Sequence, residues 1–142
     1  LRGFRSVEDR WLTAWTLDGL GRAAHLSGDF DLAARCLLEG AQLFLGLGDT
    51  KNGVTTLLGY AAAEHRLGNH ASSARTLAAV TNPADREVID GEIAPEFDLS
   101  AVCAEYRASH PEEWRRGLSL ELSALVGELG ETRSSGDKGR GS

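Results

Sequence analysis

The histidines are the side chains whose chemistry and spacing first suggest a site. His25 and His65 lie forty residues apart, and a glycine follows each of them after three residues. An imidazole can bind a metal ion or exchange a proton near neutral pH. The two rings are the best candidates for a functional pair, against the alternative that each only packs or caps near the end of its helix. His70 follows His65 by five residues, a poor helical spacing for two ligands of one metal, so no metal site is predicted.

Motifs for catalysis are missing from the rest of the sequence. It contains no phosphate-binding loop, no nucleophile elbow, no H-E-x-x-H zinc motif and no paired C-x-x-C. Cys36 and Cys103 lie in different predicted helices, where single thiols usually behave as small buried hydrophobes. Trp11, Trp15 and Trp114 could form an aromatic cage, but at helical spacing they are expected to pack. We therefore expect no enzyme activity, no cofactor and no metal.

Charge and hydropathy exclude further classes of function. The 142 residues carry a formal net charge of -6, and no basic cluster is visible, so direct nucleic-acid binding is not expected. No apolar run is as long as a membrane span or a signal-peptide core, so we expect a cytoplasmic chain without membrane contact. The chain begins at Leu1 and contains no Met, which suggests a fragment, a processed chain or an unusual start codon.

The elements that must position these residues come in two copies. A shift of forty residues aligns the chain with itself, and nine of the 22 positions from 16 to 37 are then identical. The matching positions in the first copy are Thr16, Leu17, Gly19, Ala23, His25, Gly28, Ala34, Arg35 and Leu37. Self-similarity at a fixed period is typical of a repeat architecture.

The first copy has the pattern of two helices joined by a tight turn. Apolar residues recur every three or four positions on both sides of Gly28. Ser6, with Asp9 three residues later, has the form of a capping box, and Gly28 suits the left-handed residue at a helix end. Asp29 can cap the second helix, which Gly48 closes.

The second copy repeats this pattern from about Gly53 to Val80, with its turn at Gly68 and Asn69. Small residues are expected where the antiparallel helices approach each other. In the first copy these are Gly21, Ala24, Ala33 and Ala34, and their counterparts are Ala61, Glu64, Ser73 and Ala74. Three of the four positions stay small, and Glu64 is the exception.

Further helices are predicted after the repeats. A helix begins at Pro83 and stops at Gly91, and another runs from about Leu99 to Ser109. Pro111 begins a helix that Gly117 is expected to break, and Ser119 is expected to cap a last helix that ends at Gly130. No apolar residue occurs from 131 to 142, so this segment is predicted to be a disordered tail.

The turn and packing pattern resembles the tetratricopeptide repeat. Leu20 and Gly21 form its L-G pair, and the turn glycine, aromatic, alanine and apolar positions are filled by Gly28, Phe30, Ala33 and Leu37. The usual period is about 34 residues. The longer period here adds residues to the second helix and its exit, "LFLGLGDTKNG".

The longer variant resembles the repeats near the C-terminal end of large bacterial ATP-dependent transcriptional regulators of the LuxR and AfsR types. The resemblance covers most of residues 11 to 129 and includes the stretch "AWTLDGLGRAAHLSGDFDLAARCLLEGAQLFLGLGD". The segment "EEWRRGLSLELSALV" is similar to the one that closes the helical region of those proteins, through Trp114, Gly117, Leu118, Ser119, Leu120 and Glu121. In such regulators the repeats receive an inducer or partner signal that controls an ATPase switch.

The tetratricopeptide resemblance implies a concave groove lined by the first helix of each copy, where a partner binds. The implied positions in the first copy are Trp15, Asp18, Arg22, His25 and Leu26. In the second copy they are Thr55, Leu58, Ala62, His65 and Arg66. The two arginines are expected to favour an acidic or polar peptide. Asp18 stands where a carboxylate clamp needs a cation, so the resemblance disfavours a peptide C-terminus as ligand.

Taken together, the sequence predicts an all-α fold of tetratricopeptide-like hairpin repeats with C-terminal capping helices. Residues 1–130 form the repeat domain, with hairpins at about 7–47 and 50–80 and capping helices at about 83–130. The expected function is a non-catalytic protein-interaction or signal-sensing module of a bacterial transcriptional regulator. The alternatives are a free-standing peptide-binding tetratricopeptide adaptor, and an enzyme whose active site has no recognisable motif.

The open end of the array suggests a further contact. Two hairpins are fewer than the three or so units that repeat arrays normally need. The first helix carries Trp11, Leu12 and Trp15, more apolar surface than one inward stripe requires. We expect Trp11 and Leu12 to contact upstream repeats of the same polypeptide, or a second copy in a homodimer of the isolated chain.

Overall fold

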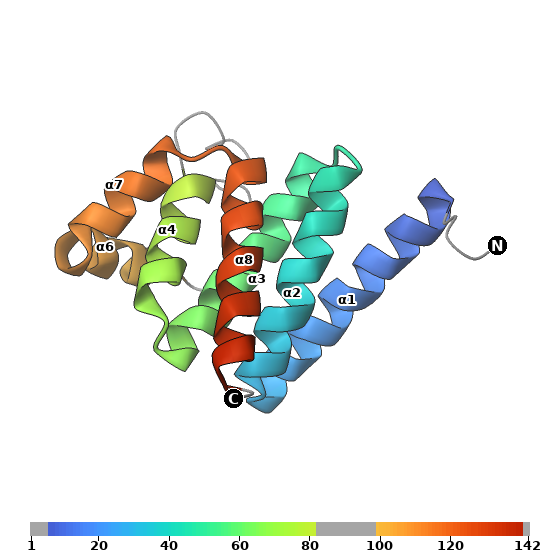
Figure 1. Ribbon diagram of the computed structural model, residues 1–142, viewed down its shortest axis with the longest axis horizontal. Coiled ribbons are helices and arrows are strands. Elements are labelled where there is room, and N and C mark those ends of the chain that lie inside the picture. The colour runs from blue at the N-terminus through green and yellow to red at the C-terminus, as the bar shows by residue number, and fades with distance from the viewer. Residues whose placement is uncertain (1–5, 82–98, 141–142) are drawn as a thin grey trace.

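The computed structural model describes residues 6–81 and 99–140, and every regular element among them is an α-helix. The helices are α1 (Val7–Ser27), α2 (Phe30–Gly46), α3 (Thr50–Leu67), α4 (His70–Val80), α6 (Ser100–Ser109), α7 (Pro111–Ser119) and α8 (Leu122–Arg140) (Figure 1). The helix predicted between Pro83 and Gly91 lies outside the described residues. The predicted all-α fold of hairpin repeats with C-terminal capping helices is confirmed.

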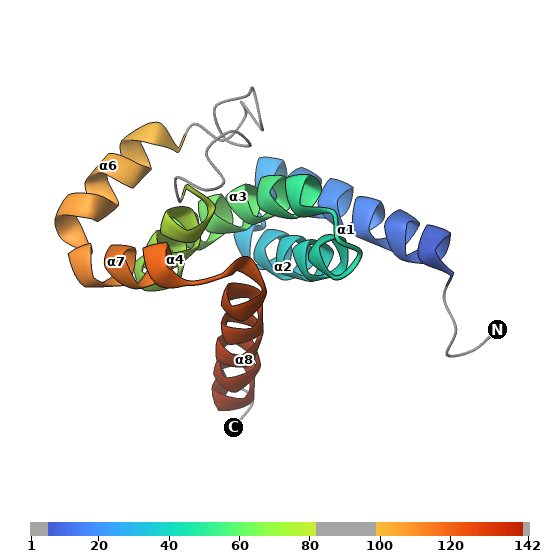
Figure 2. The same ribbon diagram turned by 90° about the horizontal axis from the view of Figure 1, so that it is seen from above.

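Seen from above, the helices form two layers (Figure 2). One layer holds α1, α3 and α6, and the other holds α2, α4 and α7. Successive helices of the two hairpins pack on each other, and α7 continues the row by packing on α4. The last helix, α8, leaves the row and contacts α2 and α4. The C-terminal helices therefore extend and cover the array of hairpins.

Side-chain caps and left-handed glycines define the helix ends. Ser6 accepts a hydrogen bond from the amide of the third residue after it, and Asp29 and Asp49 do the same for α2 and α3. Gly28 and Gly68 end α1 and α3 with φ angles of 88° and 83°, a conformation that favours glycine. The equivalent turns of the two copies are thus built in the same way. Asp49 caps α3, which begins at Thr50, where the second hairpin was expected to start.

Small residues occupy the closest helix contacts, as the sequence predicts. A Cβ atom on Gly21 would lie 2.5 Å from Cγ of Leu37, so a side chain there would force Leu37 or the two helices to move. In the second copy Ser73 keeps this spacing and donates its hydroxyl to the carbonyl of Ala61 at 2.8 Å. Larger apolar side chains fill the remaining core, among them Leu37, Phe44, Leu57, Tyr60 and Leu77.

The structure corrects the prediction for Gly117. This residue lies within α7, where a Cβ atom would meet the carbonyl oxygen of Arg75 at 2.3 Å and Cβ of Ala78 at 2.7 Å. Gly117 therefore marks the crossing of α7 over α4 and does not break the helix. Ser119 does not cap α8 either, because its hydroxyl donates to the carbonyl of Arg116 and α8 begins only at Leu122.

The structure also differs from the sequence prediction after Gly130. The segment expected to be a disordered tail continues α8 as far as Arg140. Leu125 and Leu129 are buried in the core that α8 shares with the repeats, and Arg133 reaches back to acidic residues of α2 and α3. The apolar pattern stops at Gly130, so only a charged contact could reveal the continuation.

Two further sequence expectations concern thiols and membranes. Cys36 and Cys103 are both buried and unpaired with each other, as expected for thiols in different helices. Burial raises the pKa of both thiols, which keeps them protonated. Within residues 6–81 and 99–140, no helix is long and apolar enough to cross a membrane.

The crossing at Gly117 makes a direct prediction. Gly117→Ala places a methyl group against the backbone of α4, so α7 must move away. We expect the free energy of unfolding to fall by about 1–3 kcal/mol, the usual cost of overpacking. Urea unfolding followed by circular dichroism measures this change.

The matched control is Gly127→Ala. Gly127 is an exposed glycine of α8, and a Cβ atom added to it would have no atom within 4 Å, so alanine only improves helix propensity. The control should be stabilised by up to about 1 kcal/mol. Equal stabilisation of both variants would show that α7 does not approach α4 this closely.

Candidate functional site

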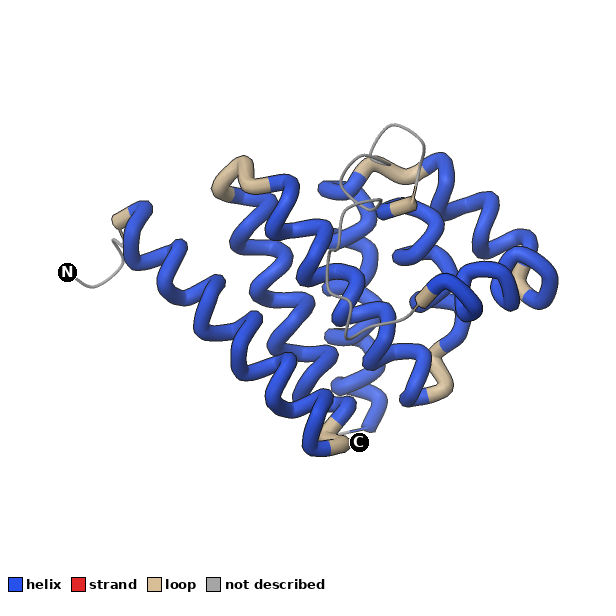
Figure 3. The backbone as a smooth tube through the Cα atoms, turned by 180° about the vertical axis from the view of Figure 1, so that it is seen from behind, coloured by secondary structure: helices blue, strands red, loops and turns tan. Residues whose placement is uncertain are grey.

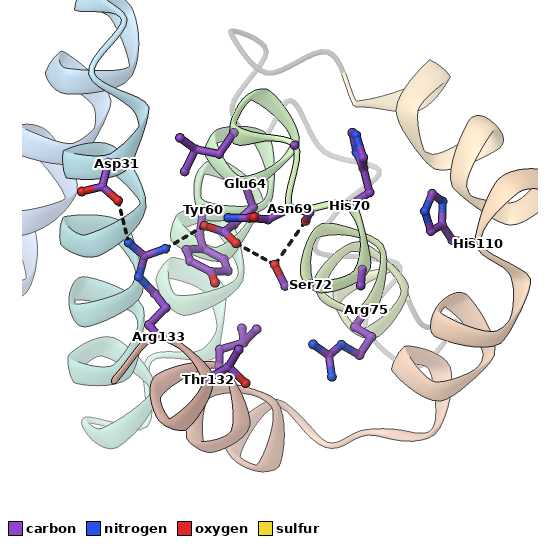
Figure 4. A pocket seen from close by; sticks show the side chains of 14 residues that line it. Asp31, Tyr60, Glu64, Asn69, His70, Ser72, Arg75, His110, Thr132 and Arg133 are labelled. Atoms are coloured by element: carbon purple, nitrogen blue, oxygen red, sulfur yellow. Dashed lines mark hydrogen bonds and ion pairs between the residues drawn. The ribbon is translucent and has the colours of Figure 1, made fainter. Parts of the chain in front are cut away.

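An open pocket of about 680 Å³ lies where the second hairpin meets the C-terminal helices (Figure 4). Its walls come from Asp31 of α2, from α3 and α4 with the turn between them, from α8, and from His110 between α6 and α7. Polar side chains predominate in this turn pocket, namely Asp31, Glu64, Asn69, His70, Ser72, Arg75, His110, Thr132 and Arg133.

A buried carboxylate anchors the turn pocket. The side chain of Glu64 is only 4% exposed, and its Oε1 accepts a hydrogen bond from Nη1 of Arg133 at 2.8 Å. Its Oε2 accepts from the hydroxyl of Ser72 at 2.7 Å. Arg133 also pairs with Asp31 of α2 at 3.2 Å. The buried charge is thus compensated by partners from α4 and α8, as burial requires.

Tyr60 lies beside this ion pair. Burial, and then the neighbouring Glu64 carboxylate, raise the pKa of the Tyr60 hydroxyl far above its ordinary value. The phenol therefore stays protonated at neutral pH and offers a hydrogen-bond donor, not a base.

A second ion-pair group fixes α4, α7 and α8 relative to one another. Arg75 of α4 donates to Glu128 of α8 at 2.6 Å, and one of its nitrogens lies 3.2 Å from a carboxylate oxygen of Glu113 of α7. Arg116 also donates to Glu128, at 2.8 Å. Because Arg75 is mostly buried, these contacts belong to the packing of the three helices rather than to a screened surface pair.

A cluster of three histidines around Tyr106 adjoins the turn pocket on the side of α6. The hydroxyl of Tyr106 lies 2.6 Å from Nδ1 of His65 and 2.9 Å from Nδ1 of His70. The ring of His110 packs against Tyr106 at 5.4 Å between ring centres, and against His70 at 5.8 Å. This histidine cluster joins the α3–α4 turn to α6 and to the start of α7.

The hydroxyl of Tyr106 has only one proton, which constrains the two histidines. It can donate to only one of the two Nδ1 atoms, so for both contacts to be hydrogen bonds at least one Nδ1 atom must carry a proton and donate to the hydroxyl oxygen. Burial is the main cause that lowers the pKa of His65, followed by the charges of His70 and Arg66, while Glu105 opposes them. The folded state therefore favours a neutral His65.

The polar groups of the turn pocket differ in how far contacts within the chain already occupy them. Both oxygens of Glu64 already accept hydrogen bonds, which leaves this carboxylate poorly placed to accept a proton from a ligand. Among the described residues, no group of three or more His, Cys, Asp or Glu side chains could hold a metal ion. Imidazole, amide and hydroxyl groups remain as the donors and acceptors that a ligand can meet.

Comparisons with protein-family models, curated proteins and solved structures found no match for this chain. The arrangement of helical hairpins is a finding of the structure. A tetratricopeptide origin, and a link to LuxR-type or AfsR-type regulators, depend on the sequence patterns alone.

The structure gives the predicted groove residues of the first copy different roles. Asp18 is buried, pairs with Arg22 at 2.9 Å and accepts a hydrogen bond from Thr56 at 3.0 Å. Asp18 is therefore an interior link between α1 and α3, which corrects its prediction as a contact for a partner. Trp15 is half exposed and meets Phe44 edge-on, so it remains accessible.

The predicted groove residues of the second copy also include both buried and accessible side chains. Leu58 and Ala62 belong to the buried core, which corrects their prediction as groove residues. Thr55 is partly exposed and donates its hydroxyl to the carbonyl of Lys51 at 3.0 Å. Arg66 is exposed, and its guanidinium lies 4.9 Å from the centre of the Phe30 ring.

The predicted pairing of His25 with His65 is replaced by two separate contacts. His25 packs edge-on against Phe30 at 5.1 Å, whereas His65 joins the histidine cluster around Tyr106. Burial, then the charge of Arg66, lower the pKa of His25 as well. Residues His70 and Tyr106 were not predicted as site residues, although His70 is only two positions beyond the turn glycine. Because Gly68 reverses the chain, the five-residue spacing brings the two imidazoles together.

The lowered pKa of His65 predicts a specific acid sensitivity. The unfolded chain binds a proton on this ring near the ordinary pKa of 6.5, and the folded chain binds it only at lower pH. The stability that follows is complete above about pH 6.5 and is lost as the pH falls through the lowered pKa of folded His65. Histidine-selective NMR titration of folded and urea-unfolded protein measures both values.

A matched stability experiment uses His65→Gln. Wild type should lose more free energy of unfolding between pH 7.5 and pH 5.5 than this variant does, although His25 still contributes to both. A folded-state pKa of His65 at or above that of the unfolded chain, or an unchanged pH dependence in the variant, would contradict this assignment.

Proposed function

We propose that this chain is a non-catalytic protein-interaction or signal-sensing module, and that it acts within a cytoplasmic bacterial transcriptional regulator. The observation that carries the interaction role is the turn pocket, an open cavity with many polar side chains in its lining at the junction of hairpins and capping helices. The regulator role is supported by the sequence resemblance of residues 11 to 129 alone. An ATP-binding domain encoded upstream in the same reading frame is expected on this proposal.

The charges around the turn pocket suggest the class of ligand. Arg133 and Arg75 already pair with carboxylates of the same chain, so a charged ligand must compete with these contacts. His70 and His110 use Nδ1 for their contacts with Tyr106 and Ser109, so Nε2 is the nitrogen that can face a ligand. An uncharged polar segment, such as the backbone of an extended peptide, satisfies these groups at the smallest electrostatic cost.

The position of α8 supplies a means of signalling. Leu129, Thr132 and Arg133 of this helix form one wall of the turn pocket, and Arg133 holds the wall to Glu64 (Figure 4). A ligand that binds better when α8 is docked than when it is released shifts that equilibrium towards docking. The sensing role therefore needs no chemical step, only a difference in affinity between two positions of one helix.

Selection of a displayed library of short peptides against the full chain tests this proposal. Bound peptides should perturb the NMR resonances of His70, His110 and Arg133. The double variant Asn69→Ala with His110→Ala removes two hydrogen-bonding side chains of the turn pocket. We expect this variant to weaken a selected peptide about tenfold or more, since each hydrogen bond contributes about 0.5–1.5 kcal/mol.

The matched control is His25→Ala, which removes a histidine that packs on Phe30 outside the turn pocket. The control should bind the selected peptide with unchanged affinity. The proposal fails if no peptide is selected, if selected peptides perturb residues elsewhere, or if the purified chain binds and hydrolyses ATP.

A further inference from the structure

The outer side of α1 exposes large apolar residues to solvent. Leu12 is 64% exposed, Trp15 50% and Leu26 81%, although all three belong to a helix of the main array. Together with Gly19 and Ala23, which are also exposed, they form a stripe that we call the outer face of α1. Figure 3 shows that α1 forms one edge of the row of helices. An apolar stripe at such an edge usually marks a contact surface.

The residues of α1 are distributed in the opposite way from those of an ordinary surface helix. Its buried side carries Ala14, Gly21 and Ala24, together with the polar Asp18. Most of its larger apolar side chains, among them Leu12, Trp15 and Leu26, are exposed instead, whereas Trp11 and Leu17 are partly buried. A surface helix of a monomer normally turns its apolar stripe inward and its charged residues outward. The distribution here is that of a helix packed on both sides.

Gly19 is a second and independent sign of a missing neighbour. It lies in the middle of α1, and a Cβ atom built on it would have no atom within 4 Å. It is not among the positive-φ glycines of the described residues, so its backbone does not require glycine. An exposed glycine inside a helix costs about 1 kcal/mol relative to alanine. Close approach of another helix from outside gives this glycine a role.

The outer face is symmetric about Gly19 in a way that fits a second copy. Trp15 and Ala23 lie four residues before and after Gly19, and Leu12 and Leu26 lie seven residues before and after it. In an antiparallel pair of α1 helices with a two-fold axis at Gly19, large Trp15 meets small Ala23, and Leu12 meets Leu26. An interface between identical copies must be self-complementary in this sense.

We propose that two copies of this chain associate through the outer faces of antiparallel α1 helices, with Gly19 at the crossing. The face contains no charged residue, so no like charges meet within the stripe. The chain carries a net charge of -6, so two copies repel each other at long range. Salt screens this repulsion, and added salt should therefore strengthen the dimer.

The structure revises the residues that the sequence assigned to self-association. Leu12 keeps that role because it is exposed on the outer face. Trp11 and Trp15 both meet the Phe44 ring, at 5.9 Å and 5.2 Å between centres, but Trp15 is half exposed whereas Trp11 is partly buried, so Trp11 chiefly packs within the chain. Trp15, which the sequence placed in the partner groove, belongs to the outer face instead.

Sedimentation velocity over a concentration series tests the association of the full chain. Wild type should change from monomer to dimer, and Leu26→Glu should raise the dissociation constant by about tenfold or more, because burial of a leucine is replaced by burial of a charge. Leu26 is largely exposed in the single chain, so the variant should still fold. The matched control is Leu118→Glu, which changes an exposed leucine of α7 and should leave the dimer intact.

Gly19→Leu separates the dimer from the fold. Among the described residues, a Cβ atom on Gly19 meets nothing within 4 Å, and leucine favours the helix, so this variant should unfold at a higher temperature as a monomer yet dimerise less than wild type. Mixed Leu12→Cys and Leu26→Cys proteins should form a disulfide between copies, whereas Leu12→Cys alone should form little. The proposal fails if wild type remains monomeric, or if Leu26→Glu or Gly19→Leu dimerises as tightly as wild type. A disulfide between two Leu12→Cys chains would contradict the antiparallel arrangement.

Discussion

A carboxylate that is buried inside a helical repeat must be paired, and this requirement organises the part of the molecule that holds the candidate site. Glu64 lies between the helices of the second hairpin, where the first hairpin has Ala24. Removing such a charge from water costs several kcal/mol unless a well-placed cation and hydrogen bonds offset the cost. Ser72 supplies one hydrogen bond from the same hairpin, and Arg133 supplies the cation from a helix that is far away in sequence.

This pairing connects the fold to the candidate site. For Arg133 to reach Glu64, α8 must lie across α2 and α4, where Leu125 and Leu129 enter the shared core. The ion pairs of Arg75 with Glu113 and Glu128 then fix α7 and α8 relative to α4. The turn pocket is the space enclosed by these contacts.

The sequence predicted the parts of the structure that depend on local rules. Asp29 as a cap and Gly28 as a turn residue both act within a few positions, and the structure confirms both assignments. Long-range contacts could not be predicted in this way. Glu64 already stood out as the one large residue among small counterparts, but nothing near it in sequence indicates that Arg133 is its partner. Gly117 was predicted to break a helix, because the sequence does not show that α4 approaches this residue and excludes a side chain there. His70 and Tyr106 belong to separate helices, so their meeting depends on the packing of α6 against the α3–α4 turn.

The most direct test of whether the Glu64–Arg133 ion pair holds α8 on the repeats is a double-mutant cycle between Glu64→Gln and Arg133→Gln. The measured quantity is the free energy of unfolding in urea. Both side chains are mostly buried, and we expect a favourable coupling of about 1–3 kcal/mol between them. The exposed pair of Asp31 and Arg35, one helical turn apart, provides the reference cycle; because Asp31 also contacts Arg133, it is measured with Arg133 intact, and its coupling should not exceed about 0.5 kcal/mol. Effects at Glu64 and Arg133 that add within about 0.5 kcal/mol would contradict the claim that this ion pair holds α8 on the repeats.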